Sequence, residues 1–131
     1  MSNKPKAIIV TFPVQFLYDI GYGCGKKEII LNGFKECIRQ IESIKHDPEM
    51  YWLHSMGNKP VHEKEILYCY VNILSKIRYK AKVIGFEPGG EKEFDDGRKR
   101  TAKHWLLLHE FEKVPEIRMG GFQGFRYWKY D

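Results

Sequence analysis

The chain has 131 residues, of which 43% are hydrophobic and 15% aromatic, and it carries a formal net charge of +5. This length and apolar content predict one folded domain over residues 1–131 and argue against a disordered chain. No apolar run approaches the ~20 residues of a membrane-spanning helix, and no secretory signal precedes the first predicted strand. We therefore expect a cytoplasmic protein without a membrane partner.

Cysteine and histidine usage gives no sign of a metal centre or a disulfide framework. The three cysteines are irregularly spaced, and no Cys-x-x-Cys pair occurs. The five histidines show neither His-x-x-x-His nor His-Glu-x-x-His spacing. We therefore expect reduced cysteines, scattered core and surface histidines, no metal and no cofactor.

The first third of the chain predicts a strand, a loop and a helix. The β-branched run 7–12 is followed by proline and is typical of a buried strand. The glycine-rich loop 21–27 has neither Walker nor dinucleotide-binding spacing, which favours a flexible loop that can still contact a ligand. Apolar residues then recur at three- and four-residue steps over 34–44. This pattern predicts an amphipathic helix with Asn32 as its N-cap, although the first turn can begin earlier, and with Asp47–Pro48 as its stop.

From residue 50 onward the pattern is that of strands. Strands are predicted at 66–73, 78–86 and 105–109, with breaks or turns at 74–76, 88–90 and 95–97. Pro115 then interrupts the chain before a glycine- and aromatic-rich tail. This order predicts an α+β protein, a small and mostly antiparallel barrel with one or two decorating helices.

A basic strand is the first candidate for contact with phosphates. Arg78, Lys80 and Lys82 alternate with apolar residues and therefore share one face of the predicted strand. Exposed strands also carry lysines for solubility and against edge-to-edge aggregation. Phosphate contact and plain solvation explain this face equally well.

A denser basic cluster lies at residues 98–104, directly before Trp105. Its cations Arg98, Arg100 and Lys103 can grip phosphates while the neighbouring ring stacks on a base. The acidic residues just before the cluster can instead neutralise it across a hairpin. We favour the phosphate-binding interpretation because of the adjacent tryptophan.

Two further segments combine aromatic and hydrogen-bonding side chains. In the C-terminal stretch, Phe122 is followed by Gln123 and Arg126, which suit a base edge or a phosphate, although some of these rings must close the core. The segment 50–60 joins a Tyr-Trp pair to a Gly-Asn-Lys-Pro turn. A plain turn and a pocket wall explain that segment equally well.

The order of these segments resembles the PUA-like superfamily, in particular its EVE and ASCH branches. The resemblance is carried by the Tyr-Trp pair at 51–52, Gly57-Asn58-Lys59-Pro60, the runs 66–71 and 77–85, Trp105-Leu106-Leu107-Leu108, and Gly121-Phe122-Gln123-Gly124-Phe125-Arg126-Tyr127. It covers roughly residues 50–130 and implies a small pseudo-barrel. Its cleft would receive RNA or a modified base in DNA, held flipped in an aromatic cage.

Carried over residue by residue, the resemblance implies a set of nucleic-acid-binding residues. Those expected around the cleft are Trp52, Asn58, Lys59, Trp105, Phe122, Gln123 and Arg126. Those expected on backbone phosphates are Arg98, Arg100 and Lys103, and the basic strand adds Arg78 and Lys80. We therefore expect a nucleic-acid-binding module without its own catalysis.

Two alternatives stay open. The ASCH signature is only partly matched by the Gly-Asn-Lys-Pro turn, since Pro60 and Val61 stand where a hydroxyl is wanted. An ASCH-like hydrolase acting on modified nucleosides or RNA would use Lys59 and Glu63 as its reactive pair. The other alternative is a protein-interaction module that exposes its C-terminal aromatic residues.

One geometric question decides between a cage and a packed core. A binding cleft requires Trp52, Trp105 and the segment 123–126 to converge on one hollow. Rings sealed inside the core, with the arginines scattered, would contradict the binding interpretation.

Overall fold

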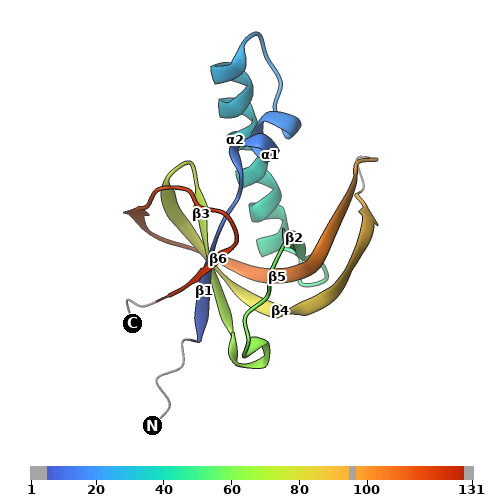
Figure 1. The fold of residues 1–131 in the computed structure, drawn as a ribbon. Helices are drawn as coiled ribbons and strands as arrows, with labels where there is room; N and C mark the ends of the chain where they lie inside the picture. Colours follow the sequence, from blue (N-terminus) through green and yellow to red (C-terminus); the bar gives the residue numbers. More distant parts are fainter. Residues whose placement is uncertain (1–5, 95–96, 129–131) are drawn as a thin grey trace.

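The computed structural model describes residues 6–94 and 97–128. These residues form a curled, mixed sheet that is open like a half-barrel, with the helices at one end (Figure 1). In chain order the elements are β1 (Ala7–Thr11), α1 (Val14–Ile20), α2 (Lys26–Lys45), β2 (Trp52–Met56), the 3-10 turn η1 (Glu63–Glu65), β3 (Tyr68–Ile73), β4 (Lys76–Glu93), β5 (Lys99–Arg118) and β6 (Phe125–Tyr127). The strand order is β2-β5-β4-β3-β1-β6. Among the described residues, β1 and β3 pair in parallel, and the other neighbouring strands pair antiparallel. The predicted α+β class and the mostly antiparallel, barrel-like sheet are confirmed.

The strand predicted at 7–12 is confirmed as β1, which lies between β3 and β6. Successive side chains of β1 point to opposite faces of the sheet. Ile8 and Val10 therefore belong to one buried cluster, and Ala7 and Ile9 belong to the other. Parallel strands need a long crossover, and the chain between β1 and β3 supplies it with both helices and β2.

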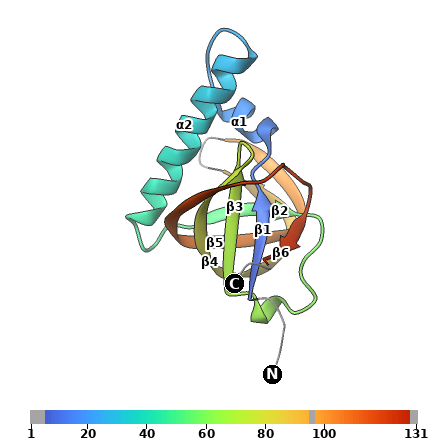
Figure 2. The ribbon, with the colours of Figure 1, turned by 90° about the vertical axis from the view of Figure 1, so that its left-hand side faces the viewer.

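The sequence pattern did not predict α1. This two-turn helix packs closely on α2, which extends well beyond the sheet at its N-terminal end (Figure 2). Two glycines permit the approach: a Cβ added at Gly33 would overlap the carbonyl oxygen of Leu17, and one at Gly21 would overlap that of Ile29. The helix pair therefore depends on these positions lacking side chains.

The predicted helix is longer than expected at its N-terminal end. It begins at Lys26, so the assignment of Asn32 as N-cap is wrong. The Asn32 side chain, one and a half turns inside α2, donates its amide to the carbonyl oxygen of Tyr22 at 2.8 Å and fixes the preceding loop instead. The predicted stop is confirmed, because α2 ends at Lys45, just before Asp47–Pro48.

Two predicted interruptions of the strands are wrong. β4 runs through Pro88-Gly89-Gly90, where its described partner is β5 alone, so the missing proline N–H costs no bond to a second strand. β5 runs through Pro115, which lies opposite a register shift between Ile77 and Tyr79. The break at 74–76 is confirmed as a tight turn in which Leu74 and Ser75 have positive φ angles of 51° and 62°.

The long β4–β5 hairpin projects past the rest of the sheet (Figure 1). In the described residues, β2 pairs with β5 only as far as His104. We call residues 88–94 and 97–103 the arm. At its tip the N–H of Phe94 donates to the carbonyl oxygen of Arg98 at 2.8 Å, and Gly97 has a φ of 86°. Asp95 and Asp96 of the predicted turn lie outside the described residues.

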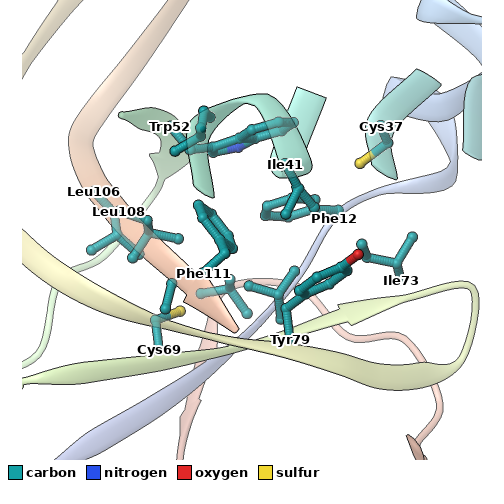
Figure 3. Close-up of a cluster of buried hydrophobic side chains, with 14 of the residues drawn as sticks. Phe12, Cys37, Ile41, Trp52, Cys69, Ile73, Tyr79, Leu106, Leu108 and Phe111 are labelled. Atoms are coloured by element: carbon teal, nitrogen blue, oxygen red, sulfur yellow. The ribbon is translucent and has the colours of Figure 1, made fainter. Parts of the chain in front are cut away.

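The main core lies between the concave face of the sheet and α2 (Figure 3). It includes Phe12, Cys37, Ile41, Trp52, Cys69, Ile73, Tyr79, Leu106, Leu108 and Phe111. Burial raises the pKa of the Cys37 thiol to about 12, so this thiol stays protonated. The three cysteines are free, as expected. In the part of the chain that the structure describes, no helix is long and apolar enough to cross a membrane.

Candidate nucleic-acid interface

A pocket of about 610 Å³ opens between the C-terminal half of α2, the segment 49–51, β2 and the arm. Its lining brings aromatic and basic side chains together from five parts of the chain. The rings are Phe12, Phe16, Tyr51, Trp52, His54, Phe94 and Trp105, and the arginines are Arg39, Arg98 and Arg100. The volume falls within the range of about 300–1,000 Å³ that is typical of ligand sites.

Stacked rings form the floor of the pocket. Trp52 stacks on Phe12 with ring centroids 4.8 Å apart and planes 10° from parallel, and His54 stacks on the same ring at 5.5 Å. Trp52 is only 9% exposed. Its ring therefore offers little free area, and the floor is rigid and mostly apolar.

Trp105 supports the wall and has little free face. Its side chain is 1% exposed, and its indole N–H donates to the carbonyl oxygen of Gly90 at 3.1 Å. Phe94 contacts it edge-on with centroids 6.2 Å apart. In this conformation the ring fixes the base of the arm, and the stacking role expected of it would need a rearrangement.

Three rings of the pocket are more accessible than Trp52 and Trp105. Tyr51 is 48% exposed, and Phe16 on α1 and Phe94 at the arm tip are both half-buried. The guanidinium carbon of Arg98 lies over both rings, 5.5 Å from the centroid of Phe16 and 5.4 Å from that of Phe94. Arg98 thereby connects the arm to α1 across the pocket mouth.

The three arginines of the pocket differ in their partners. Arg39 is tied to Glu36 by two hydrogen bonds, one of them at 2.8 Å, and this pairing lowers the pKa of the Glu36 carboxyl to about 2. Arg100 is exposed and, among the described residues, has no carboxylate partner. A cation without a counter-ion in a pocket is available to an anionic ligand.

His54 faces this unpaired cation. Burial and, to a lesser extent, the charge of Arg100 lower the pKa of its imidazole to about 4. The ring is therefore neutral near pH 7 and presents one donor and one acceptor nitrogen. Sequence analysis missed this residue, although the two-residue period of β2 places it on the same face as Trp52 and Met56.

Phe16 and Arg39 were also missed from the sequence. Phe16 belongs to the helix α1 that no pattern predicted, so no signal for it existed. Arg39 lies on the polar face of α2, where a solvated helix surface was the simplest interpretation. Its contact with the pocket depends on which side of the helix faces the arm, which spacing alone cannot give.

The structure brings together only part of the predicted site. Trp52, Arg98, Arg100 and Trp105 line the same pocket. Lys103 is exposed on the arm but does not line the pocket. Trp52 and Trp105 therefore meet at one pocket, where both rings are buried, but the segment 123–126 does not reach it. The convergence expected of all three is not found.

Asn58, Lys59 and Glu63 belong to the loop between β2 and β3, at the end of the sheet away from the helices (Figure 1). Lys59 Nζ lies 3.1 Å from Glu63 Oε2, so the proposed reactive pair is in contact. Neither residue lines the pocket. The contact is that of an ordinary ion pair spaced by four residues, and no observation links it to a ligand.

The C-terminal residues lie at the opposite edge of the sheet from β2. Arg126 belongs to the edge strand β6, and its guanidinium carbon lies 4.3 Å from the centroid of Phe122. Gln123 is exposed nearby, and none of the three lines the pocket. The aromatic residues described in this segment, up to Trp128, are half-buried or buried, so they do not form the exposed C-terminal patch expected of a protein-interaction module. Tyr130 lies outside the described residues.

The basic strand is engaged in contacts within the chain. Arg78 Nε donates to the carbonyl oxygen of Ile73 at 2.8 Å, and its guanidinium lies over the ring of Phe34. Lys80 Nζ lies 4.3 Å from the centroid of Tyr68. Neither side chain lines the pocket. Both instead make contacts within the chain that stabilise the fold.

Comparison with protein-family models, with curated proteins and with solved structures found no match to this chain. Among the described residues, no group of three or more histidine, cysteine, aspartate or glutamate side chains could hold a metal ion. The chemistry of the pocket is that of aromatic rings, three arginines, the carboxylates of Glu49 and Glu93 and a neutral imidazole.

Proposed function

We propose that this protein is a nucleic-acid-binding module of the PUA-like type, which receives RNA or a modified, flipped base in the pocket between α2 and the arm. The observation that carries the proposal is the pocket of about 610 Å³ lined by three arginines and a group of aromatic rings. Arginine binds phosphates while ring faces hold unstacked bases.

The charges support a phosphate-bearing ligand. Arg100 lacks a carboxylate partner among the described residues, and Arg39 and Arg98 line the same hollow. Neutral His54 adds a hydrogen-bonding group suited to a base edge. A purely apolar ligand would leave the Arg100 guanidinium without a counter-ion in the pocket, which is unfavourable.

The curled half-barrel also supports the PUA-like type, because it provides a rigid floor under a projecting hairpin. The floor is built from the stacked pair Phe12–Trp52, and the hairpin contributes Arg98 and Arg100. Functional side chains held by such rigid elements keep their geometry in the absence of ligand.

The test is binding of matched single-stranded RNA and DNA oligonucleotides at increasing salt. If about three phosphates are neutralised, the logarithm of the association constant should fall with that of the salt concentration at a slope of about −2. Arg100→Ala should weaken binding about three- to tenfold for every sequence and make the slope shallower by about 0.7.

Arg118→Ala is the matched control, because Arg118 is exposed on β5 and does not line the pocket. It should leave both affinity and slope unchanged. Binding that is flat between low and moderate salt, or equally weakened by both substitutions, would overturn the proposal.

A further inference from the structure

The guanidinium of Arg98 occupies a slot at the mouth of the pocket. The slot is formed by Phe16 on α1 and Phe94 at the end of the arm, with the guanidinium carbon 5.5 and 5.4 Å from the two ring centroids. Both rings are half-buried, so they retain faces that a ligand can reach.

The occupant shows which chemistry the slot accepts. A guanidinium is planar and carries a delocalised positive charge, and aromatic faces attract such cations. A flat cationic group of a ligand would be attracted by the faces of the same two rings.

The other charges of the pocket favour a ligand that carries both signs. Glu49 and Glu93 line the same hollow as Arg100, while Arg39 is neutralised by Glu36. Carboxylates close to a polyanion would repel it, but they would favour a positive group placed between them. Arg100 supplies the opposite charge for a phosphate.

We propose that the Phe16–Phe94 slot binds a nucleotide whose base is positively charged, such as one cationised by N-methylation, and that Arg98 is a resident occupant which this base displaces. The inference rests on the proposed function. It adds the class of base that binds, and it gives Arg98 the role of occupying the slot until that base displaces it.

The displacement predicts opposite effects of one substitution on two ligands. Removing Arg98 empties the slot, which should favour a cationic nucleotide by removing both competition and repulsion. The same change removes a positive charge from the pocket, which should weaken binding of an unmodified RNA strand. A residue that merely tied the arm to α1 would affect both ligands in the same direction.

The experiment measures binding of three matched pairs of nucleoside monophosphates by calorimetry. The cationic probes are the 5′-monophosphates of 1-methyladenosine, 7-methylguanosine and 3-methylcytidine, and each is compared with its unmodified counterpart. For at least one pair the wild-type protein should prefer the cationic form by about three- to thirtyfold. Arg98→Ala should raise the affinity for that cationic form by about threefold or more, and Phe94→Leu should remove the preference.

Controls separate this inference from folding and from the proposed function. Arg98→Gln keeps most of the side-chain length, should act like Arg98→Ala, and reports on the slot if the alanine variant unfolds. Arg118→Ala should change nothing. If the RNA oligonucleotide binds with the expected salt dependence but no pair shows a preference, or if removing Arg98 weakens both ligands, the inference fails while the proposed function stands. If RNA does not bind at all, the proposed function itself fails.

Discussion

The pocket and the C-terminal side of the sheet use the same kinds of residues in different ways. On the C-terminal side each ring has a neighbour: Tyr70 stacks on Trp128 with centroids 3.8 Å apart, and Arg126 covers Phe122. In the pocket, rings and cations line a hollow, and Arg100 has no carboxylate partner among the described residues. Aromatic and basic composition alone therefore does not identify a binding site.

The difference arises from what covers each face. The concave face is spanned by α2 and the arm, which come from distant parts of the chain and leave space between them. The outer face is covered by its own C-terminal segment, whose Trp128 belongs to the second buried cluster. A segment that packs along its own sheet fills the space that a ligand would need.

The largest expected effect is that of replacing Trp128, which should separate stability from RNA binding. Trp128→Ala should remove a buried ring from the stack with Tyr70 and lower the free energy of unfolding by about 3–5 kcal/mol. RNA affinity per folded molecule should stay unchanged, because Trp128 does not line the pocket. Chemical denaturation and a binding titration below the unfolding transition measure the two quantities. A loss of affinity in the folded variant would show that the two faces are coupled.

A pH titration tests the pocket side. The pKa of His54 is about 4 in the folded protein and about 6.5 in the unfolded chain, so the unfolded chain binds the proton more readily. Stability from this group is therefore fully present above pH 6.5 and is lost as the pH falls toward 4, by up to about 3 kcal/mol. His54→Gln cannot take up the proton.

The difference between wild type and His54→Gln in unfolding free energy, measured from about pH 7 to about pH 4, isolates this group from the carboxylates that also titrate there. The wild-type curve should fall more steeply over this range. Parallel curves would mean that the imidazole is hydrated in the folded protein, and the pocket floor would then be more open to water than its stacked rings indicate.

Much of the fold could be predicted from local patterns, whereas the site could be predicted only in part. Period and composition indicate β1, the C-terminal part of α2 and the strands on either side of the 74–76 turn. They fail at Pro88 and Pro115, because proline is tolerated wherever a strand needs no further hydrogen bond, and that depends on its neighbours. They fail at α1 for a similar reason, since its packing depends on Gly21 and Gly33.

The same limit applies to the site residues. Trp52 is far in sequence from Arg98, Arg100 and Trp105, and the antiparallel pairing of β2 with β5 places the two segments side by side. Gln123 and Arg126 have equally suitable chemistry, but β6 pairs with β1 at the other edge of the sheet. Only the strand order separates the two groups, and the strand order is not encoded in any one segment.

The smallest expected effect is that of Arg126→Ala, which sharpens the comparison by its contrast with Arg100→Ala. Arg126 is exposed and lies over Phe122, so its removal should lower the free energy of unfolding by only about 0.5–1 kcal/mol. RNA affinity and its salt dependence should match those of the wild type. Arg100→Ala should instead lower the affinity and make the salt dependence shallower. Each variant removes one exposed arginine and the same unit of charge, so a general electrostatic attraction would weaken binding equally in the two. Equal losses would mean that RNA is held by the overall positive charge of the protein, and the pocket would then have no special part in binding.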